Sequence, residues 1–143
     1  MNSAILEPAA VLVVWTLVIL FWMAFTRLPA MKKAGIDMGA QPGGRGQNLE
    51  GVLDPRVNWK AHNYAHLVEQ PTIFYATIFI IAMTGTGDMQ LNVWLAWGYV
   101  ALRIVHSLWQ ATVNTVPVRF AIFMLSTLLL LALAIHALLA AFH

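Results

Sequence analysis

The sequence YVALRIVHSLWQATVNTVPVR, residues 99–119, decides how the rest of the chain can fold. It places Arg103 and His106 inside an otherwise apolar segment, and Gln110 follows at helical spacing. Residues three and four apart share one face of an α-helix, so these three side chains are predicted to lie together. Asn114 extends this face to the end of the segment. An ionisable group at membrane depth is costly and therefore indicates a functional site.

The overall composition is that of a membrane protein. Of the 143 residues, 60% are hydrophobic and 10% are charged, whereas a soluble domain usually carries about 25% charged residues. A formal charge of +2, with no basic aromatic-rich patch, argues against a nucleic-acid partner. The sequence has no cysteine, which excludes disulfides, thiolate metal ligands and a cysteine nucleophile. Any thiol chemistry must therefore come from a substrate.

Four segments are predicted to cross the bilayer, because each matches the length needed for a hydrocarbon core about 30 Å thick. They cover residues 5–28, 57–84, 90–113 and 117–142, and a polar, glycine-rich loop at residues 29–56 separates the first two. We therefore predict one domain, residues 1–143, with an all-α fold of four transmembrane helices in an antiparallel left-handed bundle. A cleaved signal peptide is the rival interpretation of the first segment, but no positive residue precedes its apolar run.

The basic residues are distributed unevenly between the two sides of the membrane. The first loop and its flanks hold most of them, and the connection between the third and fourth spans adds one more; these are Arg27, Lys32, Lys33, Arg45, Arg56, Lys60 and Arg119. The positive-inside rule predicts that the loops at residues 29–56 and 113–118 are cytoplasmic and that both termini lie on the opposite side. Small size and the lack of organelle signals favour a bacterial inner membrane.

The second predicted span begins with a polar half, in which His62, His66 and Glu69 share one helix face. Because the second and third spans are antiparallel, their residues can be compared by depth at a rise of about 1.5 Å per residue. The predicted layers are His62 with Gln110, His66 with His106, and Glu69 with Arg103. An Arg–Glu pair makes an intramembrane charge tolerable, so Glu69→Ala is expected to cost about 3–5 kcal/mol. Glu69 and Arg103 are expected to meet either within one subunit or across the interface between two subunits.

Arg119 lies at the cytoplasmic end of the predicted bundle, in the first turn of the fourth span. A guanidinium beside a helix N-terminus attracts an anion. A thiol bound there has a lowered pKa and becomes a thiolate nucleophile. Arg119 is therefore the candidate catalytic residue.

These features resemble the MAPEG family, the membrane-associated proteins in eicosanoid and glutathione metabolism, and are most similar to its microsomal glutathione transferase branch. The family's third helix carries R-I-x-H and then a tyrosine, and P-x-R opens its fourth helix. The residues that match this pattern are Arg103, Ile104, His106, Pro117 and Arg119. Four spans, a long first loop and a polar start to the second span extend the resemblance over the whole chain.

The resemblance implies a homotrimer, with active sites between neighbouring subunits that open to the cytosol. Glutathione would bind there as co-substrate, an arginine matching Arg119 would stabilise its thiolate, and a lipophilic electrophile or hydroperoxide would arrive from the lipid bilayer. Against the family's R-x-x-x-N-x-x-E on the second helix, Glu69 is kept, while histidines stand at 62 and 66, and Gln110 replaces the tyrosine. The implied glutathione-binding residues are Glu69, Arg103, His62, His66, His106, Gln110 and Asn114.

Three functions fit these residues. The first is a glutathione-dependent transferase or peroxidase. The second is a non-catalytic member of the fold, or an accessory subunit of a larger membrane complex, in which the polar faces only hold helices together. The third is an intramembrane zinc or iron site built from His62, His66, Glu69 and His106, although Arg103 competes there for the carboxylate and repels a cation.

Overall fold

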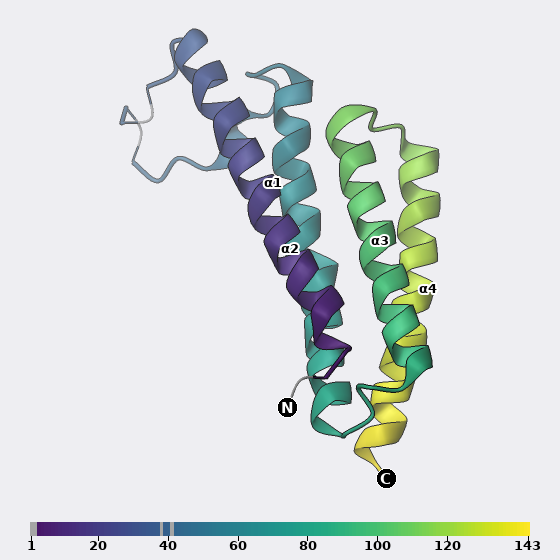
Figure 1. The fold of residues 1–143 in the computed structure, drawn as a ribbon. Helices are drawn as coiled ribbons and strands as arrows, with labels where there is room; N and C mark the ends of the chain where they lie inside the picture. Colours follow the sequence, from purple (N-terminus) through teal and green to yellow (C-terminus); the bar gives the residue numbers. More distant parts are fainter. Residues whose placement is uncertain (1–2, 38, 41) are drawn as a thin grey trace.

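The computed structural model describes residues 3–37, 39–40 and 42–143. Its four long helices are α1 (Leu6–Lys33), α2 (Pro55–Met83), α3 (Gln90–Thr112) and α4 (Val116–Ala141), and a short 3-10 helix, η1 (Gly46–Leu49), lies between α1 and α2. Both termini lie at one end of the bundle, the terminal end, while the α1–α2 and α3–α4 connections lie at the other, the loop end (Figure 1). Among the described residues there is no strand, so the predicted all-α bundle of four antiparallel helices is confirmed.

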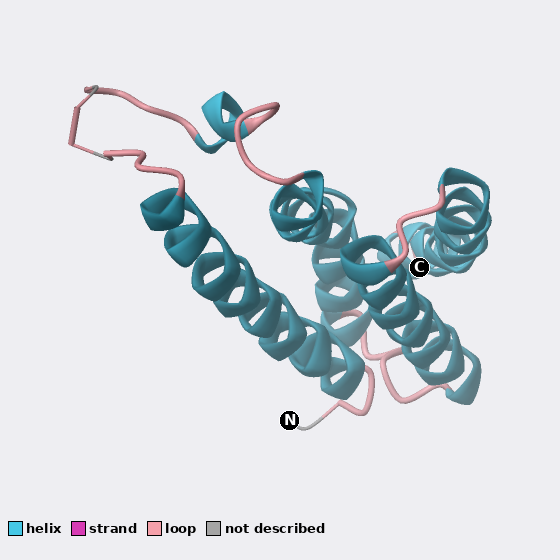
Figure 2. Ribbon diagram, turned by 90° about the horizontal axis from the view of Figure 1, so that it is seen from above, coloured by secondary structure: helices cyan, strands magenta, loops and turns pink. Residues whose placement is uncertain are grey.

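The two inner helices are α2 and α3, which pack against each other and against both outer helices. Seen from above, α1 lies on one side of this central pair and α4 on the other (Figure 2). The outer faces of α1 and α4 carry large exposed apolar side chains, among them Val14, Phe21, Phe25, Phe120 and Leu128. Such faces suit contact with lipid rather than water.

Three of the helices, α1, α2 and α4, are long and apolar enough to cross a membrane. Helix α3 has 23 residues and a length of about 35 Å, which also fits the bilayer core. It is less apolar than α1 and α4, and it buries a series of polar side chains, namely Asn92, Arg103, His106, Ser107 and Gln110. These side chains face the bundle interior, where they are shielded from lipid.

Helix α1 continues beyond the end near residue 28 that the sequence predicts, and passes through Pro29 to Lys33. A proline inside a helix removes one backbone hydrogen bond, so the additional turn needs support from elsewhere. Met31 supplies it by packing with Leu49 and Leu53 in a small cluster outside the main core. The expected boundary was wrong because this apolar contact with the loop outweighs the local effect of the proline.

Asn58, in the first turns of α2, ties the α1–α2 loop to both helices. Its Nδ2 donates to the backbone carbonyl of Leu49 at 3.1 Å, and its Oδ1 accepts from Nη2 of Arg27 at 3.2 Å. The helix itself begins at Pro55, and the side chain of Asp54 caps it by accepting from a backbone N–H. The loop end of α1 is therefore fixed relative to the start of α2.

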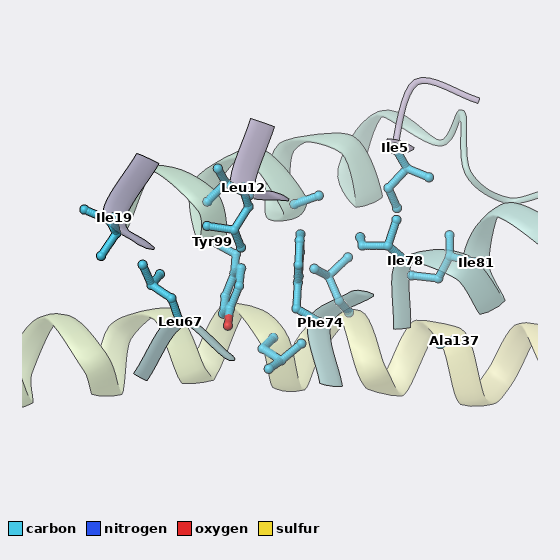
Figure 3. Packing of buried hydrophobic residues seen from close by; sticks show 13 residues of the cluster. Ile5, Leu12, Ile19, Leu67, Phe74, Ile78, Ile81, Tyr99 and Ala137 are labelled. Carbon is cyan, nitrogen blue, oxygen red and sulfur yellow. The ribbon is translucent and has the colours of Figure 1, made fainter. Parts of the chain in front are cut away.

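One hydrophobic core connects all four helices. In Figure 3, Ile19 of α1 approaches Leu67 of α2, while the ring of Tyr99 lies against that of Phe74. The Tyr99 and Phe74 ring centroids are 4.4 Å apart in a stacked arrangement. Burial in this core places the Tyr99 hydroxyl beside polar groups on neighbouring helices.

Gln70 links three helices through this hydroxyl. Its Oε1 accepts a hydrogen bond from the Tyr99 hydroxyl at 3.2 Å, and its Nε2 donates to Oγ1 of Thr127 at 2.9 Å. The two bonds join α2 to α3 and to α4. They set the rotation of the inner helices and hence the direction of the polar residues nearer the loop end.

Replacing Gln70 with leucine removes both bonds at nearly constant volume. Interhelical hydrogen bonds in membranes contribute about 0.6 kcal/mol each on average, so we expect Gln70→Leu to lower the free energy of unfolding by about 1 kcal/mol. Reversible unfolding in mixed detergent micelles measures this change. The matched control is Gln90→Leu, at the exposed first residue of α3, which should have a much smaller effect. A Gln70→Leu protein as stable as the wild type would show that this link adds nothing.

Candidate functional site

Arg103 occupies the centre of the polar region between α2, α3 and α4. Its side chain is 0% exposed, and its Nη2 donates to the backbone carbonyl of His66 at 2.9 Å. The guanidinium also lies 5.8 Å from the ring centroid of Phe123 on α4, within the range of a cation–π contact. Its Nε and Nη1 are buried with no hydrogen-bond partner in the described part of the chain. Arg103 thus contacts two neighbouring helices and still has two side-chain nitrogens available to donate hydrogen bonds.

His66 and His106 face each other across the α2–α3 contact. Their ring centroids are 5.7 Å apart at an interplanar angle of 67°. His106 is buried and its ring also lies 6.3 Å from that of Phe123, whereas His66 is partly exposed. Of the three layers predicted from matching depths, this is the one that the structure brings together.

In the described structure of one chain, Glu69 does not pair with Arg103, so the intrasubunit form of the prediction is wrong, whereas a pair across a subunit interface stays a prediction. Its side chain is 68% exposed, and its carboxylate lies 3.8 Å from Nδ1 of His66. Matching depths fix the height of a residue along the bundle but not the direction of its side chain. Helix α2 turns Glu69 outwards, and Arg103 is accommodated by a backbone carbonyl instead.

His62 and Gln110 likewise have different surroundings from those predicted. Nε2 of His62 lies 2.5 Å from Oε1 of Glu50, which follows η1 in the loop, and both side chains are about half exposed. Gln110 is buried, and its Oε1 has no hydrogen-bond partner among the described residues. Glu50 was missed by sequence reasoning because it lies in an irregular loop, where no periodicity indicates which helix it will contact.

Asn114 positions Arg119 rather than extending the polar face of α3. It follows α3 with a φ of 56°, a left-handed conformation that asparagine tolerates better than most residues. Its Oδ1 accepts a hydrogen bond from Nη1 of Arg119 at 2.5 Å. Arg119 lies in the first turn of α4, as predicted, and is partly exposed. The turn between the helices therefore holds the guanidinium at the loop end.

Asn63 is a further polar residue that sequence reasoning missed. It is fully buried on α2, and neither of its side-chain amide atoms has a hydrogen-bond partner in the described structure. A buried amide without a partner costs about 1–3 kcal/mol, which favours water or a polar ligand in this half of the bundle. Its spacing of four residues from the core residue Leu67 would have identified it as inward-facing.

The arrangement does not support the metal-site interpretation. Within the described residues, no group of three or more His, Asp or Glu side chains is placed to hold a metal ion. His62 contacts Glu50, while His66 contacts His106, so the histidines are divided between two places. A structural zinc site needs four ligands in tetrahedral geometry.

Comparison with known proteins identifies the family. The sequence model of the MAPEG family matches residues 5–139. The chain belongs to the MAPEG family. Its apolar helices and this membership make it an integral membrane protein. Comparison of this MAPEG chain with curated proteins and with solved structures gave no match.

In this MAPEG chain, Glu69 and Arg103 should behave independently. Because Glu69 is exposed, Glu69→Ala is expected to change the free energy of unfolding by less than about 0.5 kcal/mol. A double-mutant cycle with Arg103→Met, measured by unfolding in detergent, should give a coupling energy below about 0.5 kcal/mol. A coupling of about 1 kcal/mol or more would show that the two side chains do meet in the assembled protein.

Proposed function

We propose that this protein is a glutathione-dependent membrane transferase or peroxidase that acts on lipophilic electrophiles or hydroperoxides. The observation that carries the proposal is the position of Arg119, which Asn114 holds in the first turn of α4. Buried Arg103 and the pair of His66 and His106 lie between the same helices. The loop end therefore combines a fixed guanidinium with a helix N-terminus, an arrangement that attracts an anionic ligand.

In the proposed reaction, Arg119 would stabilise the glutathione thiolate. A nearby guanidinium and the free N–H groups at the start of α4 favour the ionised thiol and so lower its pKa. The thiolate sulfur would then supply the electron pair for a bond to an electrophilic carbon, and the leaving group would depart with its own pair. With a hydroperoxide, the sulfur would attack the terminal oxygen and the O–O bond would break, so that the alkoxide takes a proton from water and leaves as an alcohol. The glutathione sulfenic acid formed would react with a second glutathione to give the disulfide and water.

Polar residues on α2 and α3 provide groups suited to the rest of glutathione. Glu69 is exposed beside His66 and is available to bind the glutathione amine. Buried polar atoms of Gln110 and Asn63 have no partner in the described structure and suit a polar ligand or water. The exposed apolar faces of α1 and α4 would supply the lipophilic substrate from the bilayer.

The proposal extends to orientation and assembly. Seven of the eight lysines and arginines lie in the α1–α2 loop, its flanking turns or the first turn of α4, which favours a cytoplasmic loop end. The proposed location is a bacterial inner membrane, with both termini on the side opposite the loop end. A homotrimer, with each site between neighbouring subunits, is the assembly that the family resemblance implies.

One observation favours a non-catalytic role, such as that of an accessory subunit of a larger membrane complex. The carboxylate of Glu50 already occupies Nε2 of His62. A carboxylate of glutathione would have to displace Glu50 before it reached this imidazole. If the protein is catalytic, the contact between Glu50 and His62 only weakens glutathione binding. If the protein is non-catalytic, the same contact prevents glutathione from binding.

Arg119→Ala tests the catalytic proposal. If the guanidinium stabilises the thiolate by about 1.4 kcal/mol or more, its loss raises the pKa of the bound thiol by about one unit or more. We therefore expect the fraction of bound glutathione present as thiolate at neutral pH to fall about tenfold or more. Ultraviolet absorbance of the thiolate in the detergent-purified protein measures it. Arg56→Ala removes another exposed arginine from the loop end and serves as the control. Unchanged thiolate absorbance in a folded Arg119→Ala protein would exclude this role.

Glu50→Gln tests the contact at His62. Exposed ion pairs contribute about 0.2–1 kcal/mol, so releasing the imidazole should strengthen glutathione binding by up to about fivefold. Calorimetric titration of the variant and the wild type measures the difference. Glu7→Gln, at the terminal end of α1, controls for the loss of one negative charge. Weaker binding in Glu50→Gln would mean that Glu50 helps to hold the ligand.

A further inference from the structure

A cavity of about 550 Å³ opens at the loop end of α1. Its wall is formed by the last turns of α1, the loop that follows and η1. None of the residues proposed to bind glutathione lines it. It is therefore a second candidate binding site, and its existence does not depend on the proposed activity.

One half of this cavity is apolar and continues onto the lipid-facing side of α1. Met31 and Leu49, which line it, belong to the small cluster that supports the end of the helix. Leu28, which also lines it, follows Phe21 and Phe25 at helical spacing, and all three are large exposed side chains. An apolar stripe thus leads from the outer surface of α1 into the cavity.

The cavity wall also contains two cationic residues. Arg27 lies in the cavity wall, where Nη2 donates to the backbone carbonyl of Gly46 at 3.3 Å. A Cβ atom at Gly46 would lie 2.7 Å from Nη1 of Arg27, so the glycine permits this close approach. The Nε of Arg27 is buried without a hydrogen-bond partner among the described residues. The second guanidinium is that of Arg45, an exposed residue immediately before η1.

The acidic residue in the wall does not neutralise both arginines. Asp37 also lines the cavity, and its Oδ1 accepts a hydrogen bond from the backbone N–H of Gly39 at 2.9 Å. Two arginines and one aspartate, whose carboxylate already has a backbone partner, therefore line the same cavity. The net charge of these lining residues is positive, and guanidinium groups match the geometry of a phosphate.

The length of α1 places this cavity at the membrane surface. Its 28 residues extend about 42 Å, whereas the hydrocarbon core is about 30 Å thick. The last turns of α1 therefore lie among the lipid head groups. A ligand at this height meets both the cationic wall and the apolar stripe.

We propose that this cavity binds an anionic phospholipid, with its phosphate between Arg27 and Arg45 and an acyl chain along Leu28 and Phe25. Positive charge in the wall selects for an anionic head group. The apolar stripe favours a lipid over a soluble phosphate. The bound lipid would brace the α1–α2 loop, which Arg27 already ties to the start of α2 through Asn58.

Lipid binding to the full-length protein tests this proposal. Native mass spectrometry in a neutral detergent would compare dioleoyl-phosphatidylglycerol with dioleoyl-phosphatidylcholine, with inorganic phosphate as a soluble competitor. We expect the wild type to prefer phosphatidylglycerol, and excess phosphate not to displace it. Arg45→Gln should lower the phosphatidylglycerol affinity about fivefold, as expected for one basic residue at an anionic surface.

The matched control is Lys33→Gln, which removes the same charge from the last turn of α1 but lies outside the cavity wall. It should change the affinity less than twofold. Equal losses in the two variants, or none in Arg45→Gln, would overturn the proposal, because binding would then reflect general surface charge. Displacement by inorganic phosphate would also overturn it and would assign the cavity to a soluble anion. Lipid-free thermal unfolding confirms that both variants are folded.

Discussion

The fold depends on how one buried charge, that of Arg103, is accommodated. An arginine at the centre of a membrane helix costs about 2.5–3.5 kcal/mol even by the lowest scales, so it must find partners inside the bundle. Arg103 finds them on two other helices, in the carbonyl of His66 and the ring of Phe123. These contacts fix α3 between α2 and α4, and as a result His106 meets His66.

The same placement gives the loop end its chemical character. Because α3 and α4 are joined by a short turn, fixing α3 also fixes Arg119 through Asn114. Polar groups then gather on the interior side of the loop end, while large apolar side chains cover the outer faces of α1 and α4. A site of this kind lies where a water-soluble anion and a lipophilic molecule can meet. This is the physical basis for proposing a reaction between glutathione and a membrane-dissolved substrate.

Much of the architecture can be predicted from the sequence, because bilayer thickness and helical periodicity constrain it strongly. The four helices, their order and the contact between His66 and His106 follow from these two rules. The directions of exposed side chains do not, which is why Glu69 and Arg103 do not form the predicted pair within one chain. Contacts made by irregular loops also cannot be predicted from the sequence. The contact between Glu50 and His62 depends on the path of the loop, which no local sequence pattern indicates.

The proposed binding of glutathione as its thiolate at the loop end can be tested by calorimetric titration of the detergent-purified protein in buffers of different ionisation enthalpy. We predict binding with the release of about one proton per site near neutral pH, because the bound thiol ionises. An analogue with a methyl group in place of the thiol should bind without this release. No binding at millimolar glutathione, or binding without proton release, would contradict the account.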